Sequence, residues 1–202
     1  GDSVSVSEDA TNSDDIIFFT DKAQCYKSNA SAFDYSKASQ LGDYIPSKLA
    51  MDKDEKVVFM KCIKGNDYSK GNFMFFFENG KAAKVPLNAY ATTSNRRRLT
   101  GAYSDKAALV GILQLREERE LALYSTEGRC LLMHSASLTP KTTRATQGVA
   151  VMTLKPKYRL ERVLPVEDSG IVNMSRYRTR NLPAAGALLK AEDSEEKQDS
   201  LF

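Results

Sequence analysis

The chain has 202 residues, 27% of them charged, and a formal net charge of +3. This length suffices for one sizeable core or for several small repeated units that share one. It contains no apolar run of the roughly 18 residues that a membrane-spanning helix needs. Its polar, acidic start differs from a signal peptide. Three widely spaced cysteines and one histidine exclude a zinc site and a disulfide framework, and fit reduced thiols in the cytoplasm.

Charge is unevenly distributed along the chain. Residues 1–15 contain five acids and no base, and residues 190–202 contain five acids and two lysines. Without these ends, residues 16–189 hold 16 acids and 27 bases, a net charge of +11. A basic body between acidic ends favours a polyanionic partner, with which an acidic end can compete.

Three segments with two apolar runs around a short polar turn predict β-hairpins. They are IIFFTDKAQCYK (16–27), FMFFFENGKAAK (73–84) and LALYSTEGRCLL (121–132). The turn positions Ala23, Gly80 and Gly128 are 57 and 48 residues apart. Downstream lies a second repeated pattern, SKASQLGDY (36–44), NRRRLTGAY (95–103) and TTRATQGVA (142–150), whose glycines are 59 and 47 residues apart. The agreement between these spacings indicates an internal repeat of about 48 residues.

A further apolar strand follows each repeat glycine, namely VVFMKCI (57–63), LVGILQL (109–115) and RLERVLPV (159–166). A unit of four short strands has the size of a propeller blade. We therefore predict an all-β fold of four-stranded antiparallel blades. The expected divisions are the end of a preceding repeat (1–14), three full repeats (15–68, 69–119, 120–166), a partial repeat containing Gly186 (167–190) and an acidic disordered tail (191–202).

The aromatic stretch KGNFMFFFENGKAAKV (70–85) allows two interpretations. Its Lys-Gly start and its phenylalanines are similar to an RNA-recognition motif, whose exposed aromatic rings stack on bases. However, Asn72 and Phe73 stand where that motif requires an aromatic and then a small residue. A run that is apolar on both faces instead predicts a buried strand near the centre of a blade.

No group of residues predicts a catalytic site. His134 has no acid or cysteine nearby, and the carboxylates of REERE (116–120) are typical of a charged turn. No glycine-rich phosphate loop opens a helix. We expect no metal, no cofactor and no small-molecule substrate.

The motifs FFTDKAQCYK, FFFENGKAAKV, Arg-x-x-x-Gly and TPKTTRATQGVAVMTLK resemble the C-terminal repeats of the A subunit of bacterial type IIA topoisomerases. This family comprises DNA gyrase and topoisomerase IV, and the resemblance extends over residues 1–190. It implies a β-pinwheel, a propeller-like disc with DNA bent around its basic rim. It also implies a non-catalytic chain, because in the family the N-terminal part of the A subunit cleaves DNA strands and the B subunit hydrolyses ATP. The implied partners are double-stranded DNA and these two parts of the parent enzyme, on the nucleoid in the cytoplasm.

The gyrase box Gln-Arg-Arg-Gly-Gly-Lys-Gly has no full counterpart in the chain. In the family this box is associated with DNA wrapping and negative supercoiling. The stretches NRRRLTG (95–101) and TTRATQG (142–148) keep only its arginine and final glycine. The sequence is therefore compatible with either gyrase or topoisomerase IV as the parent enzyme.

Bending duplex DNA requires cations along a curved edge and no base-specific contact. Arg97 and Arg144 lie four residues before a repeat glycine, where the family has arginine. The arginines of SRYRTR (175–180) alternate, so in a strand they project from one face. The predicted DNA-binding residues are Lys27, Lys37, Lys81, Lys84, Arg96, Arg97, Arg98, Arg129, Lys141, Arg144, Arg176, Arg178 and Arg180.

Two other functions stay open. A propeller-like disc can serve as a protein-docking platform, and pairing of the predicted cations with acids of the body would favour that function. The second is an RNA-binding module, which the mismatched aromatic motif disfavours.

Overall fold

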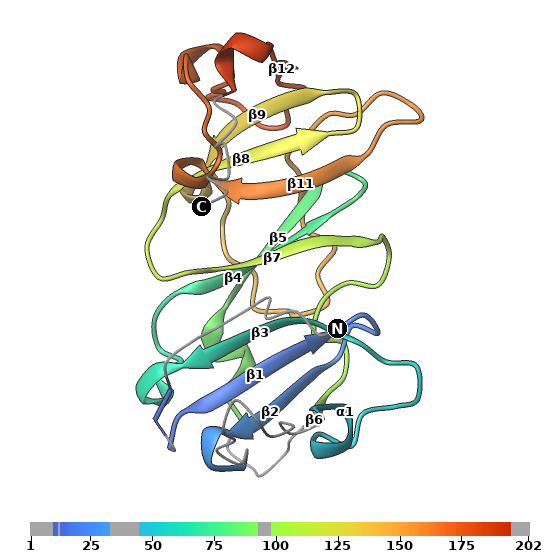
Figure 1. The fold of residues 1–202 in the computed structure, drawn as a ribbon, viewed down its shortest axis with the longest axis vertical. Helices are drawn as coiled ribbons and strands as arrows, with labels where there is room; N and C mark the ends of the chain where they lie inside the picture. Colours follow the sequence, from blue (N-terminus) through green and yellow to red (C-terminus); the bar gives the residue numbers. More distant parts are fainter. Residues whose placement is uncertain (1–9, 12, 33–44, 93–97, 195–202) are drawn as a thin grey trace, which may run out of the picture. The chain divides into compact units, whose positions relative to one another are not determined.

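The computed structural model describes residues 10–11, 13–32, 45–92 and 98–194. The chain divides into two compact units, one of Gly1–Lys70 with Leu87–Asp105 and one of Gly71–Pro86 with Lys106–Phe202. The first unit contains one four-stranded sheet and the second unit contains two (Figure 1). No helix in the described ranges is long and apolar enough to cross a membrane.

The three sheets are built in the same way. The first has the order β3-β1-β2-β6, with β1 (Asp15–Thr20), β2 (Cys25–Asn29), β3 (Val57–Ile63) and β6 (Arg98–Leu99). The second has the order β10-β5-β4-β7, with β4 (Asn72–Phe77), β5 (Lys81–Pro86), β7 (Leu109–Leu115) and β10 (Val149–Ala150). The third has the order β11-β8-β9-β12, with β8 (Glu120–Ser125), β9 (Arg129–His134), β11 (Leu160–Pro165) and β12 (Ala187–Leu188).

Helical structure is confined to short segments between the strands. The one α-helix of the described residues is α1 (Ile45–Lys48). The 3-10 segments are η1 (Ala30–Ala32), η2 (Lys64–Asn66), η3 (Leu87–Tyr90), η4 (Ser135–Ser137), η5 (Val166–Asp168), η6 (Met174–Arg176) and η7 (Ala191–Asp193). All strand pairings within the sheets are antiparallel. The predicted all-β fold of four-stranded antiparallel blades is therefore confirmed.

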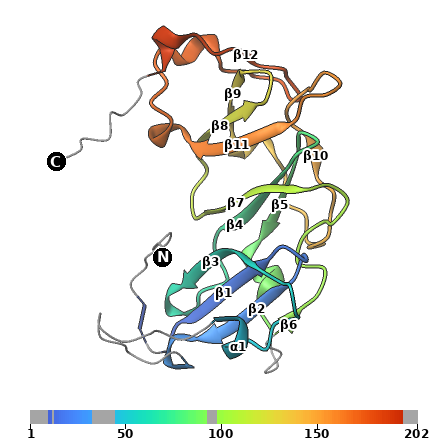
Figure 2. The ribbon, with the colours of Figure 1, turned by 45° about the vertical axis from the view of Figure 1, so that its right-hand side comes forward.

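The fourth strand of each sheet comes from the next repeat in the sequence. Strand β6 follows the second hairpin but pairs with β2 of the first hairpin. In the same way β10 pairs with β5, and β12 pairs with β9 (Figure 2). Each sheet therefore consists of three strands from one sequence repeat and a fourth strand from the repeat that follows it.

The repeat glycines allow this fourth strand to approach the hairpin. Gly148 has a φ of 73°, and a Cβ atom there would lie 2.1 Å from the carbonyl oxygen of Ala82. Gly186 has a φ of 70°, and its Cβ would lie 2.2 Å from the carbonyl oxygen of Cys130. Any side chain at these positions would overlap with backbone atoms, so only glycine fits.

The aromatic stretch that the sequence predicts as a buried strand forms β4. Residues Phe73–Phe77 are each at most 1% exposed, and β4 pairs with β5 on one side and β7 on the other. Met74 and Phe76 belong to a hydrophobic cluster that also contains Leu121 and Leu123 of β8. The prediction of a buried blade strand is confirmed, because these rings lie in the core where bases cannot stack on them.

We predict that Gly148→Ala lowers the free energy of unfolding by at least about 3 kcal/mol, because overlap with Ala82 adds to the cost of a left-handed alanine. Gly128→Ala is the matched control: Gly128 also has a positive φ of 85°, but no atom lies within 4 Å of the position that a Cβ there would occupy. It should lose only about 1–2 kcal/mol. Urea unfolding measures both; equal losses would contradict the role of the close approach.

We also predict that the three thiols do not react with a thiol reagent in the native protein. Cys25, Cys62 and Cys130 form no disulfide and are buried, and burial raises the pKa of the Cys130 thiol to about 12. The reactive thiolate is therefore almost absent at neutral pH. Three thiols should react in urea and none without it. Fast reaction of any thiol in the folded protein would show that its sheet opens.

Candidate nucleic-acid interface

A polar segment lies along the outer edge of the second sheet. The backbone N–H of Lys141 donates to the carbonyl of Lys84 at 2.8 Å, and Ala150 pairs with Lys81. The segment between Lys141 and Ala150 is therefore held on β5 at both ends. Most of its residues are exposed, including three of its four threonine and glutamine side chains, Thr142, Thr143 and Gln147.

This edge carries two lysines that no acid of the described residues neutralises. Lys141 is exposed and Lys81 is half-exposed, and neither side chain has a hydrogen-bond or ion-pair partner among the described residues. Arg144 is half-buried within the same segment. From Gly128 to Leu160 the chain contains six lysines and arginines and no aspartate or glutamate. Such an edge suits a polyanion, because a phosphate approaching it meets no carboxylate of this stretch.

Two predicted DNA-binding lysines lie inside the protein. Lys84 is 2% exposed, and its ammonium group donates to the carboxylate of Glu118 and to the carbonyl oxygens of Ser135 and Leu138 at 3.1 and 3.2 Å. Burial by itself would raise the pKa of the Glu118 carboxyl. The hydrogen bonds from Lys84 and Ser135 together lower it by more, so the pKa of Glu118 lies below its usual value.

Lys27 occupies the corresponding position in the first sheet. Its ammonium group donates to the carbonyl of Tyr90 and the hydroxyl of Thr92 at 3.1 and 3.2 Å, and lies 4.6 Å from the ring centre of Tyr68. Burial lowers the pKa of Lys27. The ammonium groups of Lys27 and Lys84 thus bind acceptors inside the protein. The prediction that these two lysines contact DNA at the surface is therefore wrong, and their role is structural.

Four predicted arginines are paired with acids of the protein. Arg98 binds Asp52 through two nitrogens at 2.7 and 3.2 Å, and Arg178 binds Glu120 at 2.9 Å. Arg129 lies 3.0 Å from Glu127, and Arg176 contacts Asp193. These guanidinium groups lie at the surface, but a carboxylate already neutralises each of them. Pairing of this kind is the feature expected of a docking platform.

The remaining predicted residues divide into two groups. Arg180 is exposed, and its side chain has no partner among the described residues. Lys37, Arg96 and Arg97 lie outside the described residues. The structure thus brings Lys81, Lys141 and Arg144 together on one edge of the second sheet, while Arg180 belongs to the chain that leads to β12.

Sequence reasoning missed a buried acid at the start of the predicted tail. Asp193 is 0% exposed and accepts hydrogen bonds from Tyr177, Asn173 and Arg176. The bonds from Tyr177 and Asn173 hold the pKa of this carboxyl below its usual value. Residues 191–193 form η7, so the predicted disordered tail cannot begin at residue 191. The local sequence does not distinguish Asp193 from the other acids of this acidic segment, because its hydrogen-bond partners lie 16 to 20 residues earlier in the chain.

No arrangement for metal chemistry occurs in the described part of the chain. No three histidine, cysteine, aspartate or glutamate side chains are placed there to hold a metal ion. His134 is exposed and uses its Nδ1 to accept from the backbone N–H of Ala136.

We predict that Lys84→Met lowers the free energy of unfolding by about 1–3 kcal/mol, because Glu118 and two buried carbonyl oxygens lose their donor. Lys141→Met removes the same charge from an exposed side chain and should change stability by less than about 0.5 kcal/mol. Urea denaturation compares the two variants. Equal stability of Lys84→Met and the parent chain would contradict the internal role of Lys84.

Comparisons with known proteins agree with this architecture. A family model described as the DNA gyrase C-terminal domain, beta-propeller, matches residues 14–40 and 140–167. The gyrase A protein of Mycoplasma genitalium is 24% identical over 139 residues, which are 68% of this chain and 16% of the relative. The chain therefore spans about one sixth of the length of this relative.

Two solved structures share the fold. The C-terminal domain of a DNA topoisomerase IV has a TM-score of 0.74 at 21% identity, over 90% of this chain and 61% of that one. A DNA gyrase A C-terminal domain has a TM-score of 0.61 at 18% identity, over 92% and 64%. The predicted β-pinwheel is confirmed. The repeats of this chain are therefore similar to those of the C-terminal domains of DNA gyrase A and topoisomerase IV.

Proposed function

We propose that this chain is the non-catalytic, DNA-bending domain of the A subunit of a bacterial type IIA topoisomerase. It would hold a duplex segment against the parent enzyme, whose N-terminal part would cleave DNA and whose B subunit would hydrolyse ATP. Its place of action would be the nucleoid in the cytoplasm. The family match and the β-pinwheel fold support this proposal.

The observation that carries the proposal is the basic edge of the second sheet, where Lys81 and Lys141 form no ion pair with the described residues. Lys81 and Lys141 would neutralise phosphates, while the threonines and Gln147 of the segment 141–150 would donate hydrogen bonds to phosphate oxygens. Such contacts fix the position of a duplex without reading its sequence. Cations on one side of a duplex also favour bending toward that side, which is the property a wrapping surface needs.

The third sheet favours a second function for its own surface. Arg129, Arg176 and Arg178 are each paired with a carboxylate, so they add little net attraction for phosphate. Each exposed ion pair contributes only about 0–1 kcal/mol to stability, so a phosphate could displace the carboxylate from its arginine. The displaced carboxylate would then repel the DNA. A protein-docking role for this sheet fits its neutralised cations better than DNA binding does.

We expect the chain to bind a duplex of about 40 base pairs with a logarithmic salt slope near −5, corresponding to about six neutralised phosphates. Fluorophores on the two DNA ends should approach each other as the complex forms. Lys81→Gln and Lys141→Gln should each weaken binding to all sequences alike and reduce the magnitude of the slope by about 1. Single-stranded DNA and RNA should bind more weakly.

Arg178→Gln is the matched control, because it also removes one charge but breaks an internal ion pair. It should leave the slope nearly unchanged. Absence of duplex binding at low salt would contradict the DNA-binding function itself. Binding whose slope responds to Arg178 and not to Lys81 or Lys141 would move the interface to the third sheet.

A further inference from the structure

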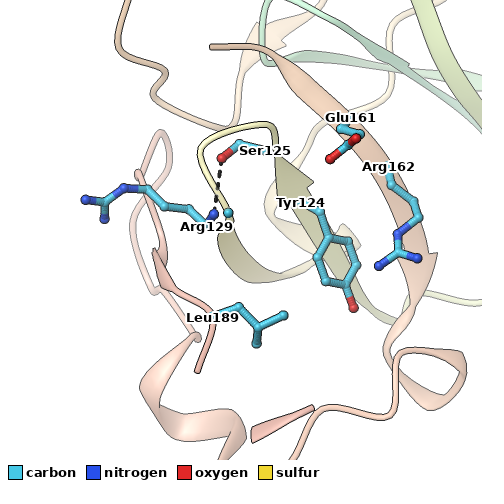
Figure 3. A pocket seen from close by; sticks show the side chains of 7 residues that line it. Tyr124, Ser125, Arg129, Glu161, Arg162 and Leu189 are labelled. Carbon is cyan, nitrogen blue, oxygen red and sulfur yellow. Dashed lines mark hydrogen bonds between the residues drawn. The ribbon is translucent and has the colours of Figure 1, made fainter. Parts of the chain in front are cut away.

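The hairpin turn of the third sheet borders an open pocket of about 430 Å³. Its lining residues come from β8, the turn, β9, β11 and the segment after β12 (Figure 3). They are Tyr124, Ser125, Gly128, Arg129, Glu161, Arg162 and Leu189. In the other two sheets, a buried side chain covers the corresponding end of the hairpin.

In the first sheet a tyrosine covers the end of the hairpin. The N–H of Ala102 donates to the carbonyl of the turn residue Ala23 at 2.8 Å. The next residue, Tyr103, is 4% exposed, and its hydroxyl donates to the carbonyl of Thr20. Thr20 is the counterpart of Ser125, which lines the pocket of the third sheet.

In the second sheet apolar side chains take this role. The N–H of Val151 donates to the carbonyl of the turn residue Gly80 at 2.9 Å, and the next residue, Met152, is 2% exposed. A methyl carbon of Leu154 lies 3.2 Å from the position that a Cβ of Gly80 would occupy. Two sheets thus close the hairpin end with a large buried side chain.

The third sheet makes the same backbone bond but lacks the covering side chain. The N–H of Leu189 donates to the carbonyl of Gly128 at 2.9 Å. The next residue is Lys190, which is exposed. No atom lies within 4 Å of the position that a Cβ of Gly128 would occupy. A lysine in place of Tyr103 or Met152 therefore leaves the pocket unfilled.

The pocket offers an apolar floor beside a cation. The guanidinium carbon of Arg162 lies 4.2 Å from the ring centre of Tyr124, and Leu189 lies opposite them (Figure 3). Arg162 is exposed and forms no ion pair with the described residues, whereas Arg129 is paired with Glu127. Glu161 also lines the pocket and offsets one positive charge, so the lining suits a ligand with a single negative charge rather than one with several phosphates.

We propose that this pocket is a docking site for an extended segment of a partner protein that presents an aromatic side chain close to a carboxylate. The aromatic ring would pack on Tyr124 and Leu189, and the carboxylate would pair with Arg162. The chain itself provides the pattern: Tyr103, which closes the first sheet, is followed two residues later by Asp105. This site is independent of the basic edge on the second sheet, so either can exist without the other.

The test is binding of a fluorescent peptide with the sequence of residues 99–106 to the full chain, followed by fluorescence anisotropy. Arg162→Glu should weaken binding at least about ten-fold, because it replaces an attractive ion pair by a repulsive one. Lys157→Glu makes the same charge change at an exposed residue outside the pocket and should leave binding unchanged. Peptides carrying Tyr103→Ser or Asp105→Asn should also bind more weakly.

A second variant tests the pocket without altering Arg162. Lys190→Tyr restores the residue type found in the first sheet, and it should raise the melting temperature and abolish peptide binding. Absence of peptide binding, or equal losses with Arg162→Glu and Lys157→Glu, would overturn the proposal. Binding that appears only after Leu201→Ser and Phe202→Ser would also overturn it, because the chain's own end would then be the occupant.

Discussion

Backbone pairing between each hairpin and a two-residue strand of the next repeat is the constraint on which the rest of the structure depends. Without β6, β10 and β12, the outer edges of β2, β5 and β9 would expose unpaired N–H and C=O groups. Gly148 and Gly186 make this pairing possible, because a side chain there would overlap with the hairpin backbone. The same pairing holds the polar segment 141–150 on β5, so one constraint fixes both the fold and the basic edge.

Sequence patterns predicted the hairpins and the buried strand β4, because apolar alternation and turn residues are local signals. They did not predict which hairpin each two-residue strand joins, because so short a segment carries no periodicity. Burial of Lys27 and Lys84 was hidden for a related reason. Their acceptors, Tyr90 for Lys27 and Glu118 for Lys84, lie 63 and 34 residues away in the chain, and nothing local distinguishes a lysine with distant internal partners from a surface lysine.

The net charge of the body is therefore not spread evenly over its surface. Carboxylates neutralise arginines on the first and third sheets, whereas Lys81 and Lys141 on the second sheet have no such partner among the described residues. Repeats of one architecture can thus carry different surfaces. The family match at residues 140–167 includes the basic segment, and the third sheet offers a protein-docking pocket instead. A shared fold positions both surfaces, while individual side chains determine what each can bind.

Chemical acetylation of lysines, read by mass spectrometry with and without duplex DNA, tests DNA binding at the basic edge most directly. Duplex DNA at low salt should protect Lys81 and Lys141, and high salt should remove this protection. Buried Lys84 should react slowly whether or not DNA is present. Unchanged reactivity of Lys81 and Lys141 in a solution where the chain binds DNA would contradict a DNA-bending role for this edge.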